Sequence, residues 1–586
     1  MDFVSNWILT AIIFMPVLGA VYVWFGSGNR LPQIRSAAMI GSMLTLLLVV
    51  WAASLHSQAQ GQTVDGYGLY HSSNWIADGD SRIDINYTVG IDGVSKWLLV
   101  LTAFLSPLAI WASFSSITNR AKEYYCLLLL LESGMLGVFC ALDLLLFYVF
   151  FEFTLIPLFF LIGTWGGQER ARAATKFFLF TVAGSVLTFA GVLYLAYHQY
   201  QYGGSGVFSL NIPTLVHHGQ SGLIPAGVQW WIFLGLVAGF AVKVPLFPVH
   251  TWLPLAHTEA PTAGSVLLAG VLLKLGTYGF VRLALPILPA GAEAFAHFMS
   301  VMAIAGIIYG ALAAWAQEDV KKLVAYSSVS HMGFCVLGMF SLKMAGVTGS
   351  VMYMLNHGLS TAALFLVVGM IYERYHTRDM NKIGGLARQM PVMAVFLIIF
   401  TLSSIGLPGL NGFIGEMLVL IGTASSGETH DGLIAGPLGM AYAVPAATGI
   451  VLGAIYMLWM CRRVLFGPVN EPPGTPDKSA GLPPDLNGRE IGILAPIAVL
   501  CLVIGVWPKP MIESMQPAIE EHILASRVVD GDMDVAQKNA DAVEQETGIA
   551  FMSSKDADSK PIDFDHADGS SESNAVTEDS GVRNGS

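Results

Sequence analysis

The sequence has little charge and lacks the residue patterns that hold redox cofactors. Only 12% of its 586 residues are charged, whereas 54% are hydrophobic, a balance that excludes an ordinary soluble domain. Its five cysteines stand singly, with no CxxC motif and no Cys/His cluster. We therefore expect no iron–sulfur, zinc or haem site and no disulfide framework. No GxGxxG fingerprint follows a strand-like segment, so we expect no dinucleotide site in this chain and any redox chemistry to take place elsewhere.

Long apolar runs, by contrast, take up most of the chain. The first shows no small-residue cleavage site and is followed by many others, so we interpret it as a retained span rather than a signal peptide. Because a helix needs about 20 apolar residues to cross a bilayer, the runs predict an all-α polytopic membrane protein with about fourteen transmembrane helices. They lie near residues 7–25, 36–55, 94–116, 123–141, 143–164, 174–197, 228–247, 261–285, 297–315, 323–342, 346–372, 392–424, 438–461 and 490–507.

Basic residues are distributed unevenly among the loops that connect these runs. Seventeen of the 29 Lys and Arg residues fall in alternate loops, whereas the opposite loops and their margins hold only four. Cytoplasmic loops carry the excess of basic residues in membrane proteins. The pattern therefore predicts that both termini face away from the cytoplasm, which in a bacterium means the periplasmic side.

Two regions outside the predicted spans have a distinct composition. The segment 509–586 contains 17 acidic and 6 basic residues, and after about residue 526 it is rich in Asp, Ser, Asn and Gly. Such a composition cannot bury enough apolar surface to fold alone, so we predict a disordered tail, with an acidic docking arm as the alternative. The loop 56–92 contains the alternating stretch RIDINYTVGID, which predicts a short hairpin that covers helix ends.

Two of the predicted spans are interrupted by helix-breaking residues. The seventh reads GFAVKVPLFPVHTWLP, with three prolines after Lys243, and the twelfth reads SSIGLPGLNGFIGE, with a proline and several glycines before Glu416. Proline removes a backbone donor and clashes with the preceding turn, so each helix is expected to break within the membrane. Non-helical backbone at that depth is tolerated only where it lines a cavity or is covered by protein.

The two breaks lie five spans apart, which is the spacing that an inverted repeat of five helices produces. The predicted organisation has helices 1–3 at 1–122, a first repeat of helices 4–8 at 123–285, an inverted second repeat of helices 9–13 at 297–461, helix 14 at 490–507, and the acidic tail at 509–586. Each repeat then carries a charged residue beside its broken helix. Paired breaks of this kind indicate an ion site.

Four ionisable residues deep within the predicted spans carry most of the prediction, because a charge there costs about 2.5–3.5 kcal/mol on insertion scales. They are Glu152, Lys243, Lys274 and Glu416. Burial lowers the pKa of a lysine and a nearby carboxylate raises it, so a change of neighbour can make a lysine hold or release a proton. A change of about three in such a pKa corresponds to roughly 4 kcal/mol, whereas moving one charge against ~100 mV costs ~2.3 kcal/mol. These residues therefore predict a proton path.

Glu152 and Lys243 are the first candidate for a contacting pair, because they lie in the fifth span and at the break of the seventh. A static ion pair that holds two helices in register is the alternative. Lys274 lies about half a span from either end, with no charge within a helical turn of it. A purely structural role is harder to explain for this lysine.

Two histidines lie within the tenth and eleventh spans, His331 and His357. A neutral imidazole can accept on one nitrogen while it donates on the other, which suits passage of protons between Lys274 and Glu416. A lone histidine within a membrane is about as often a packing residue. Both interpretations stay open from the residues alone.

Other polar residues near the spans carry weaker predictions. Glu132 in the fourth span is a candidate accessory carboxylate, whereas Asp143 lies near a span end and is expected to be solvated. His250 and His257 follow the break of the seventh span. We expect them to form hydrogen bonds at helix ends, with a place at the cytoplasmic mouth of the path as the alternative.

Six stretches carry a resemblance to a known family. They are YTVGIDGVS at 87–95, FYVFFEFTLIPLFFLIGTWGG at 147–167, VKVPLFPVHTWLPLAHTEAPTAGSVLLAGVLLKLGTYG at 242–279, EDVKKLVAYSSVSHMGF at 318–334, LNHGLSTAALFLVVGMIYER at 355–374 and GLPGLNGFIGE at 406–416. They span most of residues 85–465, and the block at 242–279 is highly specific. On these residues the chain resembles the antiporter-like membrane subunits of respiratory complex I.

The resemblance implies a proton-translocating subunit with fourteen helices in a bacterial plasma membrane, in contact with other membrane-arm subunits and with lipid. It implies that NADH, FMN, iron–sulfur clusters and quinone are bound by partner subunits, and that this chain holds no cofactor or metal. It also matches the predicted site to the family's proton path. The matching residues are Glu132, Glu152, Lys243, Lys274, His331, His357 and Glu416.

The acidic extension after about residue 510 departs from the family's pattern. Two other functions stay open alongside proton translocation in complex I. One is a subunit of a multisubunit cation/proton antiporter. Genes for hydrophilic redox subunits beside the gene for this chain would argue against that function. The other is a scaffold whose charges only position helices, for which alanine at Lys274 would leave proton pumping intact.

Overall fold

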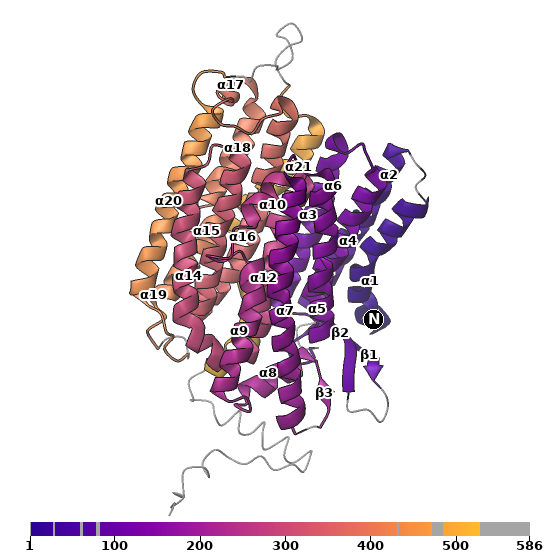
Figure 1. Cartoon of the computed structure of the whole chain (residues 1–586), viewed down its shortest axis with the longest axis vertical. Helices are drawn as coiled ribbons and strands as arrows, with labels where there is room; N and C mark the ends of the chain where they lie inside the picture. The colour runs from indigo at the N-terminus through magenta and orange to yellow at the C-terminus, as the bar shows by residue number, and fades with distance from the viewer. Residues whose placement is uncertain are drawn as a thin grey trace, which may run out of the picture. The chain divides into compact units, whose positions relative to one another are not determined.

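The predicted helical membrane architecture is confirmed by the computed structural model, which describes residues 2–26, 28, 30–58, 63–77, 83–204, 206–429, 433–470 and 484–527. Within these residues, thirteen helices are long and apolar enough to cross a membrane. Two shorter apolar helices, α18 (Pro391–Ser404) and α19 (Asn411–Ala424), together occupy the predicted twelfth span. All fourteen predicted spans are therefore helical (Figure 1).

The helices follow the apolar runs to within a few residues. The remaining helices are α1 (Asp2–Val21), α2 (Leu31–Gln58), α3 (Gly93–Ser116), α4 (Ala121–Cys140), α5 (Leu144–Phe153), α6 (Leu155–Trp165), α7 (Arg170–Tyr202), α8 (Ile212–Gln220), α9 (Ala226–Lys243), α10 (Leu253–Glu259), α11 (Thr262–Leu267), α12 (Leu273–Gly279), α13 (Leu285–Ile287), α14 (Pro289–Trp315), α15 (Val320–Phe340), α16 (Met344–Tyr375), α17 (Leu386–Gln389), α20 (Met440–Leu465), α21 (Gly488–Val506) and α22 (Lys509–Ala518).

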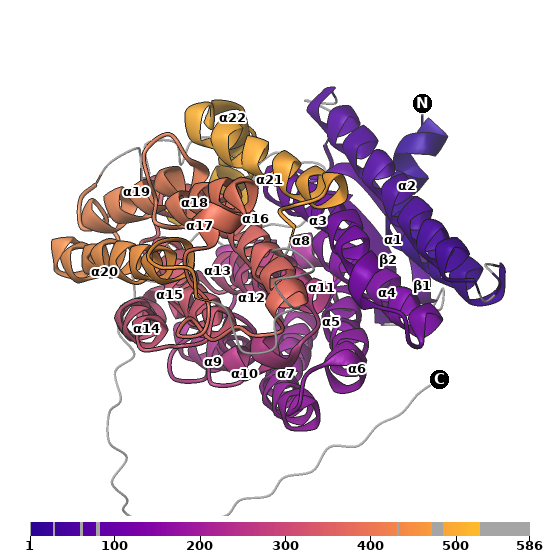
Figure 2. The same ribbon diagram turned by 90° about the horizontal axis from the view of Figure 1, so that it is seen from above.

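Two spans form the centre of this bundle. The eighth span (Thr262–Ile287) is buried in it from Ala263 onward and α16 is buried except near its two ends, whereas α1 and α2 expose many apolar side chains. Figure 2 shows α12 and α16 surrounded by the other helices, with α1 and α2 at one edge and α19 and α20 at the opposite edge. Polar side chains on the two central spans are therefore shielded from lipid by protein.

A small sheet lies at one end of the bundle, together with α8 (Figure 1). Strand β1 (Gly68–Ala77) pairs antiparallel with β2 (Ile83–Ile91), which pairs in parallel with β3 (Phe208–Ser209). The predicted hairpin in 56–92 is thus confirmed. Asp92 follows β2 directly and caps α3, because its carboxylate accepts from the backbone N–H groups of Val94 and Ser95.

Both predicted helix breaks are present. Helix α9 ends at Lys243, and the chain becomes helical again only at α10, after Pro245 and Pro248, which cannot donate a backbone hydrogen bond. Helix α18 ends at Ser404, and α19 begins at Asn411. Between them Gly406 and Gly409 have φ of +71° and +91°, the left-handed region that favours glycine. The inverted relation of the two five-helix halves stays a prediction.

Two irregularities were not predicted. The fifth span is divided into α5 and α6 at Thr154. The eighth span contains two π-helical turns, η2 (Leu268–Leu272) and η3 (Phe280–Ala284), which enclose the short helix α12. Such turns leave backbone groups free to bond elsewhere and are frequent at functional sites.

The first part of the acidic tail is helical rather than disordered. Helix α22 continues into η5 (Ile519–Ile523) and η6 (Ala525–Arg527). Apolar side chains of this stretch, Met515 and Ile519 among them, are buried, which supplies the apolar contacts that an ordered segment needs. The disorder predicted for 509–586 is therefore wrong for 509–527, and the rest of that prediction lies outside the described residues.

Candidate functional site

Lys243 lies at the end of α9 and is turned toward the division between α5 and α6. Its Nζ donates to the carbonyl of Phe151 at 3.1 Å and to Oγ1 of Thr154 at 3.2 Å, and it lies 4.1 Å from the centre of the Phe151 ring. The side chain is 4% exposed. The break in the fifth span therefore provides the polar atoms that hold this buried ammonium group.

Glu152 lies between the two residues that bind Lys243, yet it does not bind the lysine itself. Among the described residues no ion pair within 4.0 Å joins the two groups, and Oε1 of Glu152 is buried without a hydrogen-bond partner. The predicted direct contact between Glu152 and Lys243 is therefore wrong for this structure. The lysine instead binds Phe151 and Thr154, the residues one before and two after Glu152.

Lys274 is held between the two π-helical turns of the eighth span and is fully buried. Its Nζ donates to the carbonyl of Ala269 at 2.5 Å and lies 2.6 Å from Nδ1 of His357 on α16. The π-helical turn η2 contains Ala269, which explains how a carbonyl within a helix is free to accept from a side chain. Lys274 and His357 thus form a direct contact at the centre of the bundle.

His331 of α15 lies next in this arrangement. Its ring centre is 5.6 Å from that of His357, but no hydrogen bond joins the two rings among the described contacts. Nδ1 of His331 lies 2.5 Å from the hydroxyl of Tyr353, and that hydroxyl donates to Oε1 of Glu416 at 2.6 Å. His331 therefore contacts the broken twelfth span in two ways: through the Tyr353 hydroxyl to Glu416 of α19, and through Nε2, which lies 3.3 Å from Oγ of Ser404 in α18.

Glu416 lies on α19, one turn past the break, and is 3% exposed. One carboxylate oxygen accepts from Tyr353, and the other lies against Gly406, where a Cβ atom would stand only 2.2 Å from Oε2. The carboxylate therefore sits between α16 on one side and the non-helical backbone of the break on the other.

Polar side chains surround the step between the two histidines. Asn356 donates to the carbonyl of Asn411 at 2.6 Å, and Ser403 donates to Oδ1 of Asn411 at 2.5 Å. With Ser404 and Gly412, the side chains close a gap too narrow for a water molecule. Nε2 of His357 is buried here without a partner among the described residues. Transfer from His357 to His331 therefore needs a small movement.

The structure does not bring Glu132 into this group. Glu132 is fully buried on α4, where Oε1 accepts from Ser42 of α2 at 3.0 Å and Oε2 has no partner among the described residues. Its contacts are with the N-terminal helices. Glu132 thus lies on the side of α4 that packs against α2.

Two of the weaker predictions are wrong. Asp143 is 1% exposed rather than solvated, and it caps α5 by accepting from the N–H groups of Leu145 and Leu146. His257 is fully buried with its ring stacked on Phe365 at 4.6 Å, and neither of its nitrogens has a hydrogen-bond partner among the described residues. It therefore forms no helix-end hydrogen bond through its ring.

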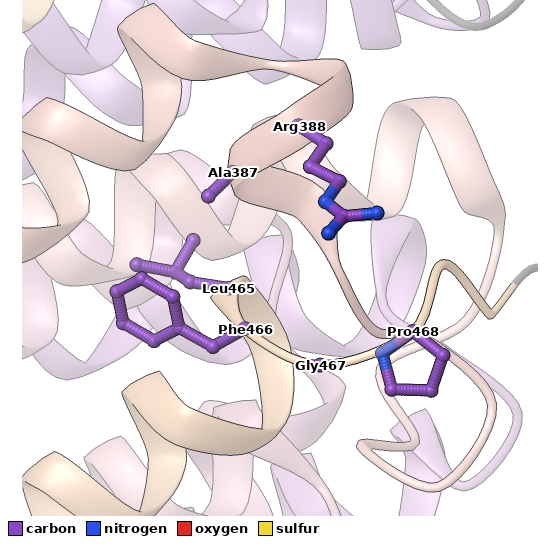
Figure 3. Close-up of a pocket in the computed structure, with 6 residues that line it drawn as sticks. All are labelled: Ala387, Arg388, Leu465, Phe466, Gly467 and Pro468. Carbon is purple, nitrogen blue, oxygen red and sulfur yellow. The ribbon is translucent and has the colours of Figure 1, made fainter.

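Tyr353 is the residue that sequence reasoning missed. It precedes His357 by four residues on α16, so the two side chains share one face of that helix. The four-residue spacing could therefore have identified Tyr353 as a candidate site residue from the sequence. A separate surface pocket is lined by Ala387, Arg388 and the stretch 465–468 (Figure 3), and no predicted site residue contributes to it.

Comparisons with known proteins agree in family and fold. The chain matches two family models, "NADH:quinone oxidoreductase/Mrp antiporter, TM" over residues 141–434 and "NADH-ubiquinone oxidoreductase chain 4, amino terminus" over residues 39–138. NADH-quinone oxidoreductase subunit M of Rhodobacter capsulatus is 40% identical over 518 residues, which cover 87% of this chain and 95% of that one. NADH-ubiquinone oxidoreductase chain 4 of Marchantia polymorpha is 39% identical over 520 residues, which cover 88% and 97%.

Solved structures show the same likeness. A chain of respiratory complex I from Thermus thermophilus with bound NADH has a TM-score of 0.75 at 29% identity, covering 88% of this chain and 99% of that one. A chain of the Mrp complex from Dietzia sp. has a TM-score of 0.73 at 21% identity, covering 89% and 98%. At 21% identity, the comparison with the Mrp complex chain shows a shared fold and nothing more.

Proposed function

The chain belongs to the family of NADH:quinone oxidoreductase and Mrp antiporter membrane subunits, and from this premise we propose that it is the proton-translocating subunit M of an NADH:quinone oxidoreductase. It contributes to the membrane arm of the complex, together with other membrane-arm subunits and lipid. NADH oxidation, FMN, the iron–sulfur clusters and quinone reduction belong to partner subunits. This chain then contributes proton transfer and no redox chemistry.

The observation that carries this proposal is the contact series from Lys274 to Glu416. Lys274 contacts His357, the ring of His357 faces that of His331, and Tyr353 links His331 to Glu416. Charged and polar groups at this depth are costly and mark ion paths. In the proposed function Lys274 holds a proton at the centre, the histidines pass it on, and Glu416 receives it beside the break of the twelfth span.

Glu152 and Lys243 have a separate role in the proposal. The lysine binds Phe151 and Thr154 on either side of the carboxylate, so its ammonium can exchange a backbone contact for an ion pair without crossing the bundle. Forming or breaking that pair changes the electrostatic environment of the path. A shift of about 4 kcal/mol from such a change exceeds the ~2.3 kcal/mol needed to move one charge against ~100 mV. Glu132 is an accessory carboxylate on the side of α2.

The orientation in the membrane belongs to the same proposal. The loops that hold most of the Lys and Arg residues face the cytoplasm, and both termini lie on the periplasmic side of a bacterial plasma membrane. Labelling of single cysteines introduced in the hairpin 68–91 with a membrane-impermeant thiol reagent tests this. Labelling from the cytoplasmic side only would contradict the orientation.

Replacement of Lys274 by alanine tests the function. In membrane vesicles that contain the assembled complex, Lys274→Ala should abolish NADH-driven proton uptake, because the central proton carrier is removed. Lys322→Ala is the matched control, since Lys322 is exposed at the start of α15; it should pump normally. Assembly of each variant is checked in the membrane. Normal pumping by an assembled Lys274→Ala complex would refute the proposal.

A cation/proton antiporter subunit is the second candidate, because the matching family model includes Mrp antiporters. The two functions differ in what drives transport. Proton uptake that follows NADH addition and persists without sodium supports the first, whereas sodium/proton exchange without NADH supports the second.

A further inference from the structure

Tyr353 is the one residue that bridges the histidine side of the path and its terminal carboxylate. We propose that Tyr353 is itself a proton-transfer residue, which passes protons from His331 to Glu416; this rests on the proposed function. The phenol lies 2.5 Å from Nδ1 of His331 and donates to Oε1 of Glu416 at 2.6 Å. In the described part of the chain, no other side chain is hydrogen-bonded to both groups; the hydroxyl of Tyr456 lies 3.4 Å from Nε2 of His331 but has no hydrogen bond to Glu416 there.

A phenol can bridge these two groups because it carries both kinds of hydrogen-bonding capacity. Its oxygen has two lone pairs and its O–H is one donor, so it accepts from the Nδ1–H of His331 while it donates to the carboxylate. Both distances lie at or below the short end for hydrogen bonds to charged groups. The three groups therefore lie in one hydrogen-bonded series, and the proposed transfer uses the tautomer in which Nδ1 of His331 carries the proton.

The step balances without any further reactant. The Nδ1–H bond of a His331 imidazolium breaks as a new O–H bond forms on Tyr353. In the same event the original phenol O–H bond breaks, and its proton forms a carboxylic acid on Oε1 of Glu416. His331 changes from cation to neutral, Glu416 from carboxylate to acid, and Tyr353 is neutral before and after. Release of the proton from Glu416, rotation of the phenol O–H and reprotonation of His331 on Nδ1 by a proton from the His357 side restore the starting arrangement.

The second oxygen of Glu416 provides a direction for that release. Oε2 lies against Gly406 in the non-helical stretch between α18 and α19. Tyr353 therefore loads one oxygen of the carboxylate from the centre of the bundle, and the other oxygen faces the break.

A purely structural role for Tyr353 is the competing explanation. Its Cβ and ring pack against Gly415 of α19, and its ring lies 5.9 Å from that of Phe334. These contacts hold α16 against α19 and involve carbon atoms. Phenylalanine keeps them and removes only the hydroxyl, so Tyr353→Phe separates the two roles.

The test compares Tyr353→Phe with Tyr124→Phe in vesicles that contain the assembled complex. Tyr124 is equally buried on α4 and has its hydroxyl bonded to Ser113 at 3.0 Å, away from the path. Since a positioned acid–base group contributes about 10²-fold or more, Tyr353→Phe should slow NADH-driven proton uptake by about tenfold or more. Tyr124→Phe should pump at the normal rate.

A second measurement excludes a structural explanation. Fluorinated tyrosine at position 353 keeps the hydroxyl and changes its acidity, so the rate of proton uptake should depend on the number of fluorine atoms. Normal pumping by Tyr353→Phe, or a rate independent of fluorination, would overturn the role of Tyr353 while leaving Lys274→Ala inactive. Normal pumping by Lys274→Ala would instead refute the underlying function.

Discussion

The ammonium group of Lys274 is fully buried, away from water. The described partners of its Nζ are a backbone carbonyl and an imidazole nitrogen, neither of which carries a negative charge. A buried ammonium group without a counter-charge is costly, and replacing it by an apolar side chain would relieve that cost. A role in stability therefore does not account for its presence, which supports the proposed role in proton transfer. The sequence could predict its burial but not its partner, because the partner depends on which spans are neighbours.

Gly406 controls the position of the terminal carboxylate. A methyl group there would stand 2.2 Å from Oε2 of Glu416, and φ is +71°. Gly406→Ala should therefore displace Glu416 and reduce proton uptake strongly. Backbone strain alone costs about 1–2 kcal/mol for an alanine in the left-handed region.

Gly409 provides the matched control for that strain. Its φ is +91°, but no atom lies within 4 Å of the position its Cβ would take. Gly409→Ala should lower thermal stability to a similar extent and keep most of the proton uptake. Equal loss of uptake in both variants would show that backbone strain, and not the position of Glu416, causes the effect.

The broken helices are the elements that supply polar atoms to the path. Two of the three breaks were predictable, because clustered prolines and glycines interrupt the seventh and twelfth spans. The third, at Thr154, was missed although Pro157 follows it by three residues; a proline leaves the carbonyl four residues earlier without its helical partner. The π-helical turns around Lys274 carry no comparable residue signal. They depend on packing between spans.

The start of α3 carries a stability prediction. Asp92 caps α3 and forms a buried ion pair with Arg282, with Nη2 and Oδ2 2.7 Å apart. Asp92→Asn leaves the arginine buried without its counter-charge, which should lower the free energy of unfolding by about 3–5 kcal/mol. Thermal unfolding of the detergent-solubilised protein measures this. Glu123→Gln removes an exposed pair with Arg120 and should change little.

The ion pair between Asp92 and Arg282 also makes the stability of the fold depend on pH. Burial acts to raise the pKa of Asp92, but the charge of Arg282 and a backbone hydrogen bond from Ser95 outweigh it, so that pKa lies well below its ordinary value. A carboxyl group whose pKa is lowered in the folded state stabilises the fold at any pH above its pKa in the unfolded chain, which is about 4. This stabilisation is lost as the pH falls below that value. The difference between wild type and Asp92→Asn should be constant from pH 6 to 8 and shrink in strong acid. A difference that shrinks near neutral pH would contradict this.

The molecule as a whole was predictable where length and composition decide the outcome. Fourteen spans followed from the apolar runs, since the cost of exposing backbone to lipid permits few alternatives to a helix. The predicted contact between Glu152 and Lys243 is absent from the structure. The lysine binds Phe151 and Thr154 instead, at a division of the fifth span that the apolar pattern did not predict. Long-range contacts depend on side-chain conformations at helix junctions, which apolar patterns do not specify.

The central claim is that Lys274 and Glu416 act in series on one proton path. The most direct test measures NADH-driven proton uptake for Lys274→Ala, Glu416→Gln and the double variant in assembled complexes. Groups in series give a double variant that loses no more than the more severe single variant. Each single variant should therefore lose most of the uptake through this subunit, and the double variant should lose no more. Losses that add, or normal uptake in either single variant, would contradict a single path.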